Sequence, residues 1–142
     1  MSESGLSTIV AATDFSEGGQ AAVAWAADLA RRHGARLVVV HATVPEPSLA
    51  STPDIAVIPR GFLEEARERA TRQRGQVTAR LTSEGLRVEP MLVVGPDVHG
   101  ILEAAAKQKA DLLVIGSHGR SAVHRLLVGS ATAYVVRDAR CP

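Results

Sequence analysis

The residues with the clearest capacity for chemistry are the glycines of segment 116–130, GSHGRSAVHRLLVGS, which directly follows the apolar run DLLVIG. Two residues separate Gly116 from Gly119, nine separate Gly119 from Gly129, and Ser130 comes next. Glycine permits left-handed backbone and the close approach of a ligand, so consecutive amides can form an anion nest. A helix that begins at Ser130 adds unpaired amides and the positive end of its dipole. The pattern therefore predicts a site for a polyphosphate.

A second polar group lies at the end of the first apolar run, where STIVAATDFS contains Thr13 and Asp14. In open parallel sheets, ligands bind beyond the carboxyl ends of the strands, so we expect this group to lie near the glycine segment. Asp14 has an alternative role as a helix N-cap, because D-F-S-E places Glu17 at capping-box spacing. The Ser130 hydroxyl can bind phosphate or Mg²⁺, and Arg120 or His118 can add positive charge near the phosphates.

Other phosphate and metal motifs are absent. The sequence contains no GxxxxGK[ST] and no GxGxxG after its first strand, which argues against a Walker-type NTPase and a dinucleotide fold. No residue stands out as a catalytic base. His41 ends an apolar run and is interpreted as a core or rim residue. The other histidines show no metal-ligand spacing, so side chains alone are not expected to bind a metal: His33, His99, His118 and His124.

The elements that must position these residues alternate regularly along the chain. Apolar runs predict strands at 7–13, 36–42, 87–94 and 111–116, and helical periodicity predicts helices at 21–32, 61–85, 95–110 and 130–140. This order predicts an α/β fold with a mainly parallel sheet and helices on both faces.

Single residues refine this prediction. Gly34 is expected to cap the first helix in a left-handed conformation, and Trp25 is expected to pack between that helix and the sheet. Pro90 lacks a ladder donor and favours an edge strand, whereas the β-branched run 36–42 favours a central one. Segment 45–59 holds four prolines and is expected to form a long loop.

Composition sets the class of protein. The chain has 142 residues, 46% of them hydrophobic and 22% charged, with a formal net charge of +1, which predicts one globular domain over 1–142. Aromatic residues make up only 3%, and neither nucleic-acid nor membrane binding is expected. Cys141 is the only cysteine and cannot form an internal disulfide. With no recognisable leader, we expect a cytoplasmic protein.

The glycine spacing matches the G-x2-G-x9-G-[ST] signature and resembles the ATP-binding branch of the universal stress protein family. ATDFSE at 12–17 is similar to the segment that follows the first strand in that family, and VVVHA at 38–42 is similar to the second strand of the family. The resemblance implies a five-stranded sheet of order 3-2-1-4-5, cytoplasmic homodimers, and bound ATP, ADP or AMP with Mg²⁺. The sequence ends at Pro142, so the last strand is expected to be missing here.

The resemblance also implies a set of nucleotide contacts. Ala12, Thr13 and Asp14 would face the adenosine, and the backbone of Ala42 would meet the adenine edge. The ribose and phosphates would be held by Gly116, Ser117, His118, Gly119, Arg120, Ser121 and Ala122, and the distal phosphates by Gly129, Ser130, Ala131 and Thr132.

Three functions fit these observations. The first is an ATP- or AMP-binding stress protein that regulates an unknown protein partner through its nucleotide state, with little or no hydrolysis. The second is a slow ATPase or adenylyl-transfer enzyme, which fold alone supports weakly. The third is a regulatory interaction module that binds no nucleotide. Turnover of ATP with Mg²⁺ and the presence of nucleotide in the purified protein separate them.

Overall fold

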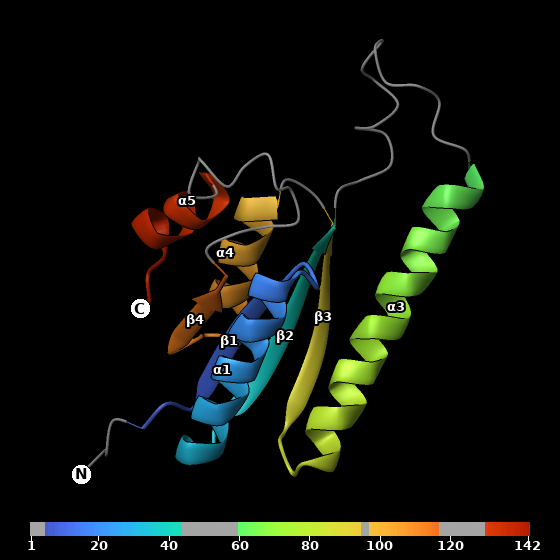
Figure 1. The fold of residues 1–142 in the computed structure, drawn as a ribbon. Coiled ribbons are helices and arrows are strands. Elements are labelled where there is room, and N and C mark those ends of the chain that lie inside the picture. Colours follow the sequence, from blue (N-terminus) through green and yellow to red (C-terminus); the bar gives the residue numbers. More distant parts are fainter. Residues whose placement is uncertain (1–4, 44–59, 95–96, 117–129) are drawn as a thin grey trace.

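The computed structural model describes residues 5–43, 60–94, 97–116 and 130–142. Strands and helices alternate along these residues (Figure 1). The strands are β1 (Thr8–Thr13), β2 (Arg36–Thr43), β3 (Val88–Val94) and β4 (Leu112–Ile115), and the helices are α1 (Glu17–His33), α3 (Arg60–Ser83), α4 (Asp97–Lys107) and α5 (Ser130–Asp138). The predicted loop at 45–59 lies outside the described residues.

In the described residues, the four strands form one parallel sheet of order β3-β2-β1-β4, which agrees with the first four positions of the order 3-2-1-4-5 implied by the family resemblance. The run 36–42 is an inner strand, with Leu37, Val38, Val39 and Val40 almost fully buried. Pro90 lies in the edge strand β3, where its missing N–H costs no ladder bond on the open side. The fifth strand does not occur among the described residues. At the outer edge of β4, the Leu113 amide instead donates to the carbonyl of Pro142, at 2.9 Å.

Two hydrophobic cores lie on opposite faces of the sheet, because successive side chains of a strand point to opposite sides. Ile9 and Ala11 of β1 face α1 and α3, where Leu81 joins the same cluster. Val10 and Ala12 face α4 and α5, where Val135 is buried. The predicted arrangement of helices on both faces is confirmed (Figure 1).

Helix α1 approaches the sheet through an alanine-rich face, with Ala22, Val23, Ala26, Ala27 and Ala30 buried. The prediction that Trp25 packs in the core is wrong, because its side chain is 62% exposed. Trp25 lies outside the buried stripe, which runs along the neighbouring face of the helix. The predicted end of the helix is confirmed: Gly34 is the C-cap, with φ of 64° in the left-handed region.

Candidate functional site

The carboxyl ends of β1 and β4 lie side by side at the point where the strand order reverses. The chain runs outward from β1 through β2 to β3 and then crosses back to place β4 on the other side of β1. Ala12 is in register with Ile115, so Thr13 at the end of β1 and Asp14 after it lie at the same edge as Gly116, which follows β4. This switch point is where open α/β sheets bind ligands. The expectation that the two polar groups lie at one edge of the sheet is therefore confirmed.

A tight turn connects β1 to α1. The buried Thr13 Oγ1 accepts a hydrogen bond from the Phe15 amide at 3.0 Å, and Asp14 Oδ1 accepts one from the Ser16 amide at 2.9 Å. The Ser16 hydroxyl also bonds Asp14 Oδ1 and accepts from the Gly19 amide at 3.2 Å. Ser16 is thus the N-cap of α1. The alternative of Asp14 as N-cap is wrong, because its carboxylate holds the capping serine instead.

Phe15 gives this turn its unusual backbone. Its φ of 61° lies in the left-handed region, which a bulky residue adopts only when its surroundings enforce it. The ring is buried and packs against the buried imidazole of His41 at the end of β2, with ring centroids 4.7 Å apart. His41 is therefore a packed rim residue, as interpreted from the sequence. The pair links the ends of β1 and β2 beneath the edge.

Gly116 is required at the end of β4 by close packing against α1. A Cβ there would lie 2.8 Å from the carbonyl oxygen of Gly18 and 3.3 Å from the Gly19 amide. The φ of Gly116 lies outside the left-handed region. Among the glycines that the structure describes, Gly34 and Gly85 have a φ in that region. At Gly116, the glycine thus allows a close helix–strand approach. Its predicted part in an anion nest stays a prediction, because the residues that follow it lie outside the described residues.

Gly19 is a second packing glycine that the sequence analysis did not single out. Its Cβ would lie 2.6 Å from Thr13 Oγ1 and 2.8 Å from Asp14 Oδ1, so only glycine fits beneath the turn. The pair of glycines in the segment SEGG was the available signal. Phe15 was missed because no local pattern predicts a left-handed phenylalanine.

The N-terminus of α5 begins at Ser130, as the glycine signature predicts, and α5 lies beside α4 near the carboxyl edge of the sheet (Figure 1). Its first turn contains no acidic residue, so nothing on the helix opposes a bound anion there. Ala131 and Thr132 belong to this first turn. Ala42 lies within β2, in register with Val93.

The remaining predicted nucleotide contacts lie outside the described residues, so they stay predictions. They are Ser117, His118, Gly119, Arg120, Ser121, Ala122 and Gly129. Within the ranges that the structure covers, no group of three or more histidine, cysteine or acidic side chains could hold a metal ion. In the same ranges, no helix is long and apolar enough to cross a membrane.

Comparison with known proteins identifies the class that this fold and edge define. The model of the universal stress protein family matches residues 5–142. A universal stress protein of Thermus aquaticus is 39% identical over 137 residues, which cover 95% of this chain and 94% of that protein. The chain belongs to the universal stress protein family.

Solved structures of the family share the fold. UspA from Lactobacillus plantarum superposes with a TM-score of 0.76 at 26% identity, over 95% of this chain and 93% of that one. A universal stress protein in complex with cAMP superposes with a TM-score of 0.71 at 28% identity, over 97% of this chain and 94% of that one.

Proposed function

We propose that this chain is a universal stress protein that binds an adenine nucleotide, ATP or AMP, at the carboxyl edge of its sheet and changes a regulatory interaction with its nucleotide state. The observation that carries the proposal is the junction of Thr13 and Asp14 with Gly116 at the switch point between β1 and β4. The family relative solved with cAMP supports an adenine nucleotide as the ligand class.

The residues present fit a nucleotide in two respects. The β1–α1 turn is held by its own hydrogen bonds and by the buried Phe15, so it offers a fixed surface for the adenosine part. The first turn of α5, starting at Ser130, offers backbone amides to phosphate. In the sequence, segment 117–129 leads from Gly116, after β4, to Ser130 and carries the remaining glycines of the signature.

Mg²⁺ would enter with the nucleotide, since no metal cluster occurs in the described ranges. Ser130 is the residue that we expect to hold it, together with the phosphate oxygens. When bound, the ion would neutralise phosphate charge. We also propose, from the family resemblance, that the protein is a cytoplasmic homodimer. Size-exclusion chromatography with light scattering tests the dimer.

The first experiment identifies the ligand. The purified protein is denatured, any released nucleotide is identified by mass spectrometry, and the affinity of the nucleotide-free protein for ATP, AMP and cAMP is measured by calorimetry. Gly119→Val is expected to weaken ATP binding by at least about tenfold, because a branched side chain removes the room that a nest provides.

The control must add the same side chain where nothing is bound. Gly75 lies exposed on α3, and a Cβ there meets nothing within 4 Å, so Gly75→Val should leave ATP affinity unchanged. Gly116→Val is unsuitable, because it disturbs the packing against Gly18 whether or not a nucleotide binds. Equal ATP affinity in the wild type and Gly119→Val would overturn the proposed site.

Turnover of ATP with Mg²⁺ distinguishes a binding protein from an enzyme. We expect a rate close to that of buffer, because the sequence contains no evident catalytic base at this edge. A clear rate above buffer that Gly119→Val abolishes would favour the slow ATPase. A protein that carries no nucleotide and binds none of the three would favour the interaction module.

A further inference from the structure

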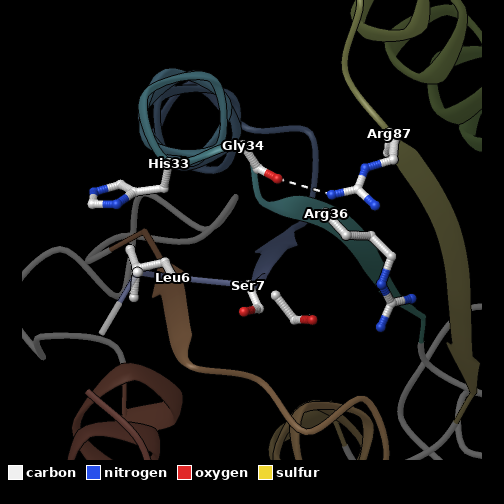
Figure 2. A pocket seen from close by; sticks show the side chains of 8 residues that line it. Leu6, Ser7, His33, Gly34, Arg36 and Arg87 are labelled. Atoms are coloured by element: carbon white, nitrogen blue, oxygen red, sulfur yellow. Dashed lines mark hydrogen bonds between the residues drawn. The ribbon is translucent and has the colours of Figure 1, made fainter. Parts of the chain in front are cut away.

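A polar pocket of about 400 Å³ lies at the amino edge of the sheet, opposite the proposed nucleotide edge. This volume lies within the range of about 300–1,000 Å³ that ligand pockets have, and the pocket is polar and open to solvent. Figure 2 shows the guanidinium groups of Arg36 and Arg87 on one side, with His33 and Leu6 on the other and Ser7 between them.

Several elements meet at this pocket because parallel strands start at the same edge of a sheet. Arg36 is the first residue of β2, and Arg87 directly precedes β3. Ser7 precedes β1, and its carbonyl accepts the Arg36 amide at 2.9 Å. Gly34, the left-handed cap of α1, closes the top of the pocket in Figure 2. The two arginines are therefore fixed at their backbones by neighbouring strands.

The side chains that line the pocket give it a positive character. Its ionisable lining residues are Arg36, Arg87 and His33, and the lining includes no carboxylate. Asp111, the carboxylate at the start of β4, accepts the amides of Ser7 and Thr8 at 2.8 and 3.0 Å. Asp111 thus binds the backbone at the start of β1, whereas Arg36 donates to Glu89 and Arg87 donates to the Gly34 carbonyl.

Each guanidinium retains donors beyond its observed bond. Arg87 Nη2 donates to the Gly34 carbonyl at 2.8 Å, and Arg36 Nη1 donates to Glu89 Oε2 at 2.5 Å. A guanidinium has five N–H donors in a planar fork, and this fork matches the oxygens of a phosphate in pairs. Glu89 lies outside the pocket lining and is half exposed, so it competes with a ligand for Arg36 alone.

We propose that this pocket binds a small molecule through its phosphate group, held by Arg36 and Arg87 together. The site is at the opposite edge from the proposed nucleotide site and shares none of its residues. The proposal therefore stands whether or not the chain binds ATP.

The test is a titration with inorganic phosphate, followed by amide chemical shifts in NMR, with chloride at matched ionic strength as the reference. The expected shifts are at Ser7, Gly34 and Arg87. Arg36→Gln and Arg87→Gln should each weaken phosphate binding by about tenfold, because each removes one charged fork. The control Arg32→Gln removes an arginine of α1 that pairs with Asp28 and does not line the pocket, and it should change binding less than about twofold.

A variant of opposite sign separates ligand binding from damage to the fold. Glu89→Gln removes the competitor of Arg36 and should tighten phosphate binding by roughly threefold or more. Shifts confined to Gly116 and Ser130, and lost in Gly119→Val, would mean that phosphate occupies only the nucleotide edge, and would overturn the proposal. A phosphate affinity that is unchanged both in Glu89→Gln and in one of the two single arginine variants would also overturn the proposal. This test requires only one of the two arginine variants to fold.

Discussion

The two edges of the sheet are held by different kinds of interaction. At the carboxyl edge, polar groups bond to neighbours two or three residues away, as Thr13 and Asp14 do in the β1–α1 turn, and glycines allow backbone to approach backbone. At the amino edge, charged groups join elements that are distant in sequence, as when Asp111 bonds the start of β1 and Arg36 bonds Glu89 of β3.

This difference has a physical consequence. Close packing and the short-range hydrogen bonds of a turn depend little on salt concentration, but they tolerate no added side-chain volume. Exposed ion pairs and charged hydrogen bonds tolerate added side-chain volume, but they weaken when a pH change neutralises one partner or when the salt concentration rises. The carboxyl edge should therefore be sensitive to side-chain size and the amino edge to ionisation. The predictions below test that contrast, from the largest expected effect to the smallest.

The largest effect is expected from Gly116→Val. Its Cβ would lie 2.8 Å from the Gly18 carbonyl oxygen, so the start of α1 must move away from β4. We expect the free energy of unfolding to fall by about 3 kcal/mol, which is typical of a tightly overpacked site. Urea unfolding followed by circular dichroism measures it, and the Gly75→Val protein is the control. A loss no larger than that of the control would mean that the helix and strand are not closely packed here.

The error at Trp25 is an error about which face of α1 is buried. Sequence periodicity placed Trp25 on a stripe with Ala22 and Ala26, and large aromatic residues are usually buried. The buried stripe instead continues through Val23, Ala27 and Ala30, so Trp25 lies outside it and is exposed. Alanines occur on both sides of this helix, and the periodicity therefore did not identify the buried face.

The inner or edge position of a strand was predictable because it depends on patterns within one segment, whereas the order of the strands came from the family resemblance. The apolar run of β2 indicated an inner strand, the proline of β3 an edge strand and Gly34 a helix end, and all three predictions are confirmed. The β1–α1 turn was not predictable in detail. Asp14 and Ser16 are both good capping residues, and the choice between them depends on the left-handed Phe15, which is held by a contact with His41 of another strand.

A smaller effect is expected from Thr13→Val in the same turn. Valine fills the space of threonine but leaves the buried Phe15 amide without its acceptor. An unsatisfied buried amide costs about 2 kcal/mol, so the urea midpoint should fall accordingly. Thr78→Val is the matched control, because the Thr78 hydroxyl only donates to the Arg74 carbonyl within α3. Similar losses in both variants would show that the turn contributes no more than an ordinary helix position.

The smallest effect, and the one that depends on pH, is expected at Asp111 on the amino edge. Hydrogen bonds from the Thr8 and Ser7 amides lower the pKa of Asp111 below its ordinary value of 3.8. A carboxyl group whose pKa is lower in the folded state contributes stability above its unfolded pKa and loses it as the pH falls through the folded pKa. Wild type should thus be more stable than Asp111→Asn at neutral pH, and the difference should shrink on acidification below the ordinary value. Urea midpoints from pH 7 down to pH 2 measure it, with Glu103→Gln, which removes an exposed carboxylate paired with Lys107 within α4, as the reference. A difference between wild type and Asp111→Asn that stays constant across this range would mean that the charge of Asp111 does not hold β1 in place. The contrast between the two edges would then rest on packing alone.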